Sequence, residues 1–124
     1  MKLVDTSAWI EYIRGTGSDT ALQVNEMIVS GEAAWCDLAA VELWNGVSER
    51  QQSKLIKLER LIVPLAINQS VWLHARKLAN AARSNGLTIP VTDIVVAACA
   101  HIHQASIEHH RDEHFDMLSR LLIL

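Results

Sequence analysis

The sequence predicts an α/β fold in which helices cover both faces of a parallel β-sheet. Short apolar segments alternate along the chain with longer segments that have the periodicity of helices, an order typical of parallel strands joined by helices. The chain has 124 residues, and half of them are hydrophobic, which is enough for one core between a sheet and its helices. We therefore expect a single domain over residues 1–124, without an internal linker or repeat.

The first strand and the first helix are predicted by the opening of the chain. Residues 2–4 form a short strand, and Asp5 stands where this strand ends. A helix over residues 7–14 follows, because apolar side chains recur there at helical spacings and Gly15 can take the left-handed conformation that ends a helix. The acid between the two elements is the first unexpected feature of the chain.

The next three elements continue the alternation. A helix capped by Ser18 or Asp19 is expected to end at a Ser-Gly pair, just before a second apolar strand over residues 33–36. Asp37 is a suitable N-cap for the following helix, which reaches Val47.

The rest of the chain predicts a similar series of elements. They are a helix over 51–61, a strand over 62–65, a helix over 68–83, a helix over 92–104, a weak strand over 106–108, a helical turn over 114–118 and a last strand over 121–124.

Four acidic residues lie where such a sheet presents its ligands, outside the carboxyl ends of the strands. Asp5 and Asp112 follow the first strand and the weak fourth strand, and Glu42 and Asp93 lie near the starts of apolar helices. Carboxylates held close together repel one another, and a hard divalent cation offsets that repulsion. A site of this kind suits phosphodiester hydrolysis, because the cation activates water and stabilises charge on the phosphate.

Each acid also has a purely structural explanation. Asp5 can cap the helix that follows it, and the helix macrodipole favours Asp93 in a first turn. Glu42 can face solvent, and Asp112 can belong to an ordinary turn. These explanations stay open beside the shared site.

Four segments follow one another across essentially the whole chain: LVDTSAWIEYIRG, AAVELWNGV, IPVTDIVVAACA and RDEHFDML. Together and in this order, they resemble the PIN domain, and in particular the VapC toxins of prokaryotic toxin–antitoxin pairs. The resemblance implies a PIN-like α/β/α sandwich whose central parallel sheet has four to five strands flanked by helices. It also implies a cytoplasmic endoribonuclease that uses Mg²⁺ or Mn²⁺.

The resemblance assigns roles to individual residues. The metal-binding and catalytic acids of the family fall on four positions, Asp5, Glu42, Asp93 and Asp112. The small hydroxyl residue after the first acid falls on Thr6, with Ser7 as a second helper, and the hydroxyl of either residue can hydrogen-bond beside Asp5. Many relatives have a further acid two residues after the fourth, where this chain has His114, and Asp116 lies off that pattern.

The resemblance also implies an RNA substrate and two protein partners. One partner is a second copy of the chain, in a homodimer, and the other is a small VapB-like antitoxin that neutralises the nuclease. The high apolar content fits a surface that partners cover. No membrane partner is expected, because no segment approaches the ~20 apolar residues of a membrane span, and the N-terminal apolar run is too short for a signal peptide.

Two related functions remain as alternatives, a catalytically inactive interaction module with the PIN fold and a non-toxin nuclease for RNA processing. A phosphoacceptor signalling domain also gathers acids at strand ends. That class would require a lysine at a late strand end, and no lysine follows Lys77.

The composition limits other kinds of site. A formal net charge of -3 with scattered charges argues against a strong basic footprint for duplex DNA. Cys36 and Cys99 lack a metal-binding spacing and are expected to be buried free thiols of a reducing compartment. His101 and His103 lie two residues apart on a helix and do not share a face, so zinc is not favoured.

Arginines and tryptophans offer less specific signals. Arg14 and Arg111 flank the predicted cleft and can either bind phosphate or simply be solvated. The tryptophans can stack on RNA bases but are expected to pack in a core or an interface: Trp9, Trp35, Trp44 and Trp72.

Overall fold

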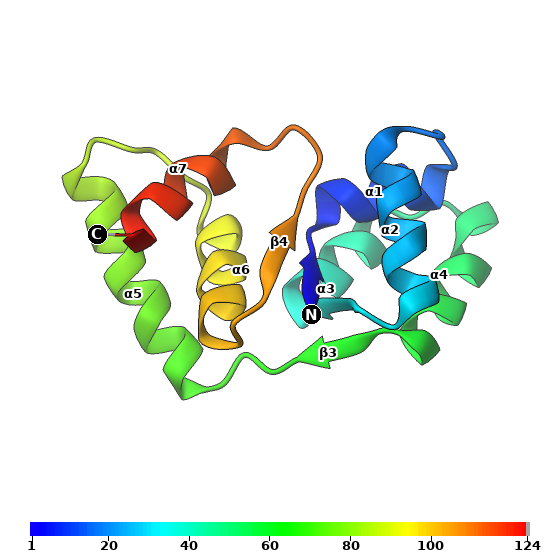
Figure 1. Ribbon diagram of the computed structural model, residues 1–124, viewed down its shortest axis with the longest axis horizontal. Coiled ribbons are helices and arrows are strands. Elements are labelled where there is room, and N and C mark those ends of the chain that lie inside the picture. Colours follow the sequence, from blue (N-terminus) through cyan, green and yellow to red (C-terminus); the bar gives the residue numbers. More distant parts are fainter. Residues whose placement is uncertain (124) are drawn as a thin grey trace.

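In the computed structural model, which describes residues 1–123, four parallel strands form the central sheet (Figure 1). The strands are β1 (Lys2–Val4), β2 (Ala33–Cys36), β3 (Val63–Leu65) and β4 (Ser106–Glu108). Their order across the sheet is β3-β2-β1-β4, and every neighbouring pair is parallel. The predicted parallel α/β architecture is therefore confirmed.

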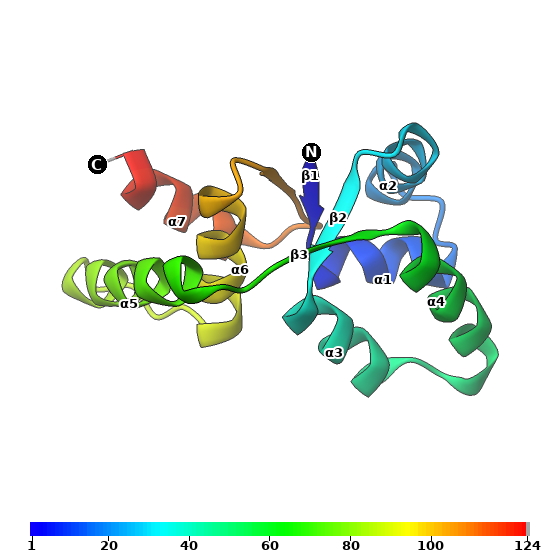
Figure 2. The same ribbon diagram turned by 90° about the horizontal axis from the view of Figure 1, so that it is seen from below.

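Helices lie on both sides of this sheet. They are α1 (Thr6–Arg14), α2 (Asp19–Ser30), α3 (Asp37–Gly46), α4 (Glu49–Leu61), α5 (Gln69–Ser84), α6 (Val91–Ile102) and α7 (Glu113–Ile123). Figures 1 and 2 show α1, α2 and α4 on one side and α5, α6 and α7 on the other. Helix α3 extends from the end of β2 and contacts both α1 and α6, so it joins the two groups (Figure 2).

Local sequence signals explain where several helices begin and end. The Ser18 hydroxyl accepts a hydrogen bond from the backbone N–H of Ala21 at 3.1 Å, which caps α2. Gly15 takes a left-handed conformation, with φ of 64°, and closes α1. Asp37 is not the predicted N-cap: it is the first residue of α3, and Cys36 holds the cap position without a side-chain hydrogen bond.

The core lies on both faces of the sheet, and α6 forms much of it on one side. Residues 94–100 of α6 are all buried, because the sheet covers one face of the helix and α5 and α7 cover the other. On the opposite face, Trp9 of α1 packs edge-to-face against Trp35 of β2, with ring centroids 5.6 Å apart. Cys36 and Cys99 are buried free thiols, as predicted.

The tryptophans divide between core and surface. Trp9 and Trp35 belong to the core, whereas Trp44 and Trp72 are 37% and 42% exposed. The expectation of a packed position is confirmed for the first two, and the other two lie on the surface of this chain.

The predicted strand at the C-terminal end is wrong. Residues 121–123 continue α7, which is also longer than the expected helical turn, and Leu124 lies outside the described residues. A short apolar run does not distinguish a strand from a buried helix segment. Phe115 and Leu118 lie three residues apart and are both buried, so α7 has a helical apolar face that packs on α5 and α6.

None of the helices described within residues 1–123 combines the length and the apolar character that crossing a bilayer requires.

Candidate active site

The carboxyl edge of the sheet brings together acids from four parts of the chain. Because β1 and β4 are neighbouring parallel strands, Asp5 after β1 and Asp112 after β4 lie at the same edge. Asp93 lies in the first turn of α6, and Glu42 lies on α3, which follows β2. Each of these acids is close enough to another for its charge to affect the pKa of its neighbour.

Asp5 is both a helix cap and a buried member of this group. Its side chain is only 4% exposed. Its Oδ2 atom accepts hydrogen bonds from the backbone N–H of Ser7 at 3.1 Å and from the Ser7 hydroxyl at 2.8 Å. Both bonds end on Oδ2, so they leave Oδ1 for another ligand. The structural and functional explanations of Asp5 are therefore compatible.

The two hydroxyl groups after Asp5 serve different acids. Ser7 donates to Asp5, whereas the Thr6 hydroxyl donates to Oε1 of Glu42 at 3.1 Å. The sequence predicted a hydroxyl hydrogen bond beside Asp5 from either residue, and the structure places it on Ser7. Thr6 instead connects the start of α1 to α3 and orients the Glu42 carboxylate.

Asp93, Asp112 and His114 form the tightest cluster of potential metal ligands among the described residues. One ligand atom from each lies within 4.8 Å of the other two. His114 Nδ1 is 3.0 Å from Asp93 Oδ2 and 3.1 Å from Asp112 Oδ1. Asp112 Oδ1 also accepts the backbone N–H of His114 at 3.0 Å, which supports the first turn of α7.

Asp116 points to a different part of the surface. Its side chain is 68% exposed, and Oδ1 lies 3.6 Å from Nε2 of His109. Of the two residues that the sequence offered in place of a fifth acid, the structure brings His114 to the acidic cluster and leaves Asp116 outside it.

Burial and neighbouring charges raise the pKa of three of these acids. Burial is the main cause of the raised pKa values of Asp5 and Glu42, and negative charge from Asp112 and Asp5, respectively, adds to it. The pKa of Asp93 is raised to about 6, first by burial and then by the charges of Asp112 and Asp5, against an opposing effect of His114. The group thus holds negative charge at an energetic cost.

The donor set fits a divalent cation. Carboxylate oxygens are the ligands that hard divalent cations prefer, and a cation favours the ionised form of acids whose pKa is raised. Asp93 and Asp112 would hold it together, while Asp5 and Glu42 face the same region from β1 and α3.

A hydrogen-bond network that sequence reasoning missed supports the loop carrying Asp112. The backbone N–H of His110 donates to the Ser7 hydroxyl at 3.0 Å, so Ser7 connects this loop to Asp5. The His110 ring lies between α1 and α2, with Nδ1 2.8 Å from the Thr20 hydroxyl and Nε2 3.5 Å from Glu11. These partners are separated by up to 103 residues, and no local pattern in the sequence marks them.

Arg111 lies beside the acidic residues of the site. It lines an open pocket with Ser7, Asp93 and His114, and its φ of 52° is left-handed, a conformation that is unfavourable for a residue with a Cβ atom. The surface therefore combines acids at the sheet edge with one exposed guanidinium beside them.

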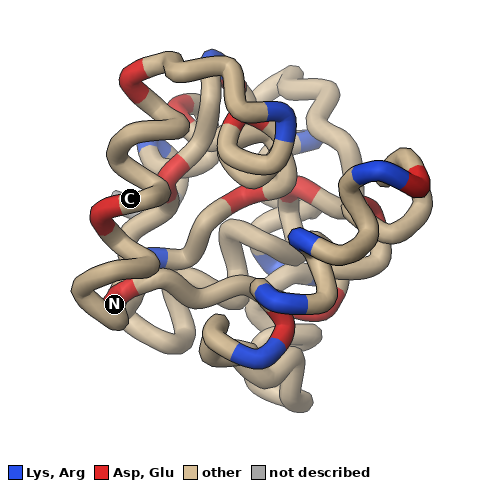
Figure 3. Tube along the Cα trace, turned by 90° about the vertical axis from the view of Figure 1, so that its right-hand side faces the viewer, with Lys and Arg blue, Asp and Glu red and all other residues tan. Residues whose placement is uncertain are grey.

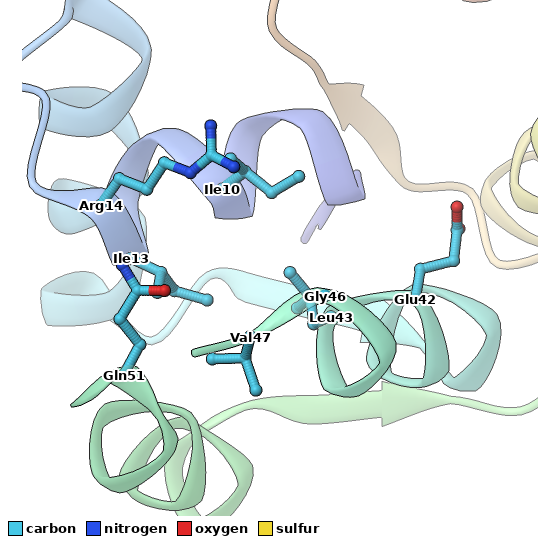
Figure 4. A pocket seen from close by; sticks show the side chains of 8 residues that line it. All are labelled: Ile10, Ile13, Arg14, Glu42, Leu43, Gly46, Val47 and Gln51. Carbon is cyan, nitrogen blue, oxygen red and sulfur yellow. The ribbon is translucent and has the colours of Figure 1, made fainter. Parts of the chain in front are cut away.

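A groove begins at Glu42 and extends away from the other three acids of the site (Figure 4). It lies between α1, α3 and the start of α4, and encloses about 100 Å³. In Figure 4, Ile10 and Ile13 of α1 face it from one side, while Arg14 lies above its far end. It is a mainly apolar hollow with an acid at one end and a base at the other.

Comparisons with known sequences connect this arrangement to one family. The family described as PIN domain matches residues 2–121. The chain is 34% identical over 126 residues to VapC ribonuclease Mb1587 of Mycobacterium bovis and to Ribonuclease VapC11 of Mycobacterium tuberculosis, covering 98% of this chain and 93% of each relative.

Comparisons with solved structures agree on the fold. The structure is similar to FitAcB from Neisseria gonorrhoeae, with a TM-score of 0.74, 19% identity and coverage of 97% of this chain and 94% of that chain. It is equally similar to VapBC2 from Rickettsia felis bound to a DNA fragment from its promoter, with a TM-score of 0.74, 18% identity and coverage of 86% and 84%.

Asp93→Asn should remove a pH-dependent loss of stability from the metal-free protein. The folded-state pKa of about 6 lies above the ordinary value of 3.8, so the folded protein keeps a proton that the unfolded chain has already released. The free energy of unfolding therefore decreases as pH rises from about 4 to about 6, and one such group lowers it by on the order of 2–3 kcal/mol. Denaturant unfolding in a chelator, across this pH range, measures the effect.

The variant should be more stable than the parent protein at neutral pH and show a weaker pH dependence. Asp116→Asn is the matched control, because its carboxylate is largely exposed and should leave the pH profile unchanged. Identical pH profiles for the parent and Asp93→Asn would contradict the raised pKa.

Proposed function

The chain belongs to the PIN-domain family, and we propose that it is a VapC-like toxin, a metal-dependent endoribonuclease that hydrolyses phosphodiester bonds in RNA and is neutralised by an antitoxin. Two curated relatives with 34% identity over nearly the whole chain are named as VapC ribonucleases, which supports the activity. We place this activity in the cytoplasm and in a single domain over residues 1–124.

The observation that carries the proposal is the set of carboxylates at the carboxyl edge of the sheet. We assign metal binding and catalysis to four residues, Asp5, Glu42, Asp93 and Asp112. Thr6 orients Glu42, and Ser7 holds Asp5. A bound Mg²⁺ or Mn²⁺ ion would lower the pKa of the attacking water and offset the charge that develops on the phosphate.

The protein itself supplies the positions of these groups. Asp5 cannot turn away, because two hydrogen bonds from Ser7 hold its carboxylate and the core surrounds it. Asp112 is held by the first turn of α7, and the loop before it is tied to Ser7 through His110. Such preorganisation keeps like charges close when no cation is present.

Arg111 is our candidate for binding an RNA phosphate near the acids. Figure 3 shows basic positions interspersed with acidic ones along the trace rather than gathered in one stripe, so substrate attraction must depend on a few local groups. Arg111 lines the pocket of Asp93 and Asp112 and is exposed. Its left-handed backbone is a cost that a substrate-binding role would explain.

The groove beside Glu42 is our candidate for the antitoxin. The similar structures include VapBC2 from Rickettsia felis, VapBC-1 from Haemophilus influenzae and FitAB bound to a DNA fragment. An apolar partner segment would pack against Ile10 and Ile13, and a basic side chain at its end would reach Glu42.

The alternatives differ in what they predict for this site. An inactive interaction module would not need four acids whose charges oppose one another, so their presence favours an enzyme. A non-toxin nuclease would keep the acids but need no neutralising partner at the groove. Substitution of Asp5 therefore tests the enzyme, and substitution of Gly46 in the groove tests the antitoxin.

Asp5→Asn should abolish metal-dependent RNA cleavage while preserving the fold. Asparagine caps a helix about as well as aspartate, so stability without metal should hold or rise as one repelling charge is lost. Cleavage should fall by orders of magnitude, and stabilisation by added Mg²⁺ or Mn²⁺ should shrink. Cleavage assays and thermal melts with and without metal measure these effects.

Asp19→Asn is the matched control, since Asp19 lies in the first turn of α2 and is exposed. It should retain both cleavage and metal stabilisation. If Asp5→Asn retained them too, Asp5 would be a helix cap alone and the proposed active site would be wrong.

Arg111→Gly should stabilise the protein and weaken cleavage together. Glycine accepts a left-handed conformation, so the free energy of unfolding should rise by about 0.5–1 kcal/mol. RNA binding should weaken because the guanidinium is gone. Gln104→Gly is the control, because Gln104 is also left-handed, with φ of 56°, but follows the distant end of α6. Equal cleavage by both variants would exclude a substrate role for Arg111.

Gly46→Leu should block the antitoxin without disturbing the nuclease. Gly46 lines the groove, and a Cβ atom there would meet no heavy atom within 4 Å, so a side chain can start at this position without a clash and a leucine would add bulk to the groove. Co-expression with the proposed VapB-like antitoxin should then give less complex and less relief of growth arrest. Ser84→Leu, at the far end of α5, controls for an added exposed leucine. Unchanged complex formation would exclude the groove as the binding site.

We also propose a homodimer, on the basis of exposed apolar side chains such as Val41, Leu61 and Trp72. Sedimentation of the chain without an antitoxin should give the mass of a dimer at micromolar concentration. A monomer under those conditions would contradict this part of the proposal.

A further inference from the structure

We propose that the His114 imidazole is a nitrogen ligand of the divalent cation, and that it makes this site prefer Mn²⁺ to Mg²⁺. The inference rests on the proposed function, because it concerns the same metal centre. It adds a protein ligand of another chemical type to the carboxylates.

The spacing of three atoms carries the inference. His114 Nδ1 lies 3.0 Å from Asp93 Oδ2 and 3.1 Å from Asp112 Oδ1. Adjacent ligands of an octahedral cation with bonds of about 2.1 Å are about 3.0 Å apart, so the nitrogen is already spaced as a neighbour of both oxygens. The three residues also form a group that can reach one ion without rearrangement of the backbone.

The position of the ring is determined by the start of α7. The backbone N–H of His114 donates to Asp112, and the next residue, Phe115, is buried in the core. The ring itself is 32% exposed, so it lies at the boundary between the core and the open pocket. A histidine held in this way is directed at the acids by the same turn that positions Asp112.

The other two histidines of this segment are engaged elsewhere. His110 contacts Thr20 and Glu11 on the opposite side of the loop. His109 Nδ1 lies 3.3 Å from the backbone N–H of Asp112, which donates to it, and its Nε2 faces Asp116. Among the histidines at 109, 110 and 114, His114 is the one whose ring nitrogen reaches two carboxylates.

Ligand chemistry then predicts the preference. Mg²⁺ takes oxygen ligands and keeps several waters, whereas first-row transition cations also accept imidazole nitrogen, with affinity for such mixed sites rising from Mn²⁺ towards Co²⁺. Exchanging an oxygen ligand for His114 therefore disfavours Mg²⁺ relative to Mn²⁺. The same spacing also suits a protonated Nδ1 that donates a hydrogen bond to the two carboxylates. Measurements with a bound cation distinguish this arrangement from one in which Nδ1 is a metal ligand.

Metal binding by the purified chain provides the first test. The dissociation constants of Mn²⁺ and Mg²⁺ are measured by calorimetry for the parent, His114→Asp and a control, His101→Ala, whose imidazole lies near the opposite end of α6 from Asp93. We expect the parent and the control to bind Mn²⁺ more tightly than Mg²⁺. In His114→Asp, the dissociation constant of Mg²⁺ divided by that of Mn²⁺ should fall on the order of tenfold or more.

A spectroscopic measurement provides the second test, independent of cleavage. Pulsed electron paramagnetic resonance of bound Mn²⁺ should show coupling to a ¹⁴N nucleus in the parent and in His101→Ala, and none in His114→Asp. Bound Mn²⁺ without nitrogen coupling in the parent, or an unchanged ratio of constants in His114→Asp, would overturn the inference.

The two proposals fail in different ways. Cleavage of RNA by a parent protein whose Mn²⁺ shows no nitrogen coupling would leave the nuclease standing and remove His114 as a ligand. Nitrogen-coupled Mn²⁺ in a parent protein that cleaves no RNA would leave the ligand standing and overturn the nuclease.

Discussion

Repulsion between carboxylates held at one edge of a sheet is the constraint on which the rest of this structure depends. Asp5 and Asp112 follow neighbouring parallel strands, and Asp93 projects from the start of α6 into the same region. Burial removes the water that would screen these charges, and the raised pKa of Asp93, about 6, records the cost. Local donors partly offset it: the Ser7 hydroxyl donates to Asp5, and the backbone N–H of His114 donates to Asp112.

The core keeps these charges from moving apart. Helix α6 is buried along residues 94–100, so Asp93 is carried by one of the most buried elements of the fold. On the other side of the sheet, Trp9 packs against Trp35 and anchors α1 directly after Asp5. The apolar content of so short a chain thus bears on the proposed function, because a loose scaffold would let the acids separate and lose the proposed cation site.

Much of this architecture follows from local patterns in the sequence. Helical periodicity and capping residues such as Ser18 determine the helices, because each pattern involves only neighbours within a few residues. The alternation of strands with helices determines a parallel sheet, and the carboxyl ends of parallel strands share one edge, so the approach of Asp5 to Asp112 was predictable. The prediction of a strand for the C-terminal apolar run was wrong, because four apolar residues are too few to show the period that distinguishes a strand from the end of a helix.

The sequence by itself determined the element types and the set of acids, whereas packing alone decided which partner each polar group has. Thr6 bonds Glu42, 36 residues away, and Ser7 receives the backbone of His110, 103 residues away. His114 reaches Asp93 only because α7 packs across α6. Hydrogen bonds are short and directional, so their partners depend on how helices settle on a sheet to within about an ångström, which no local pattern encodes.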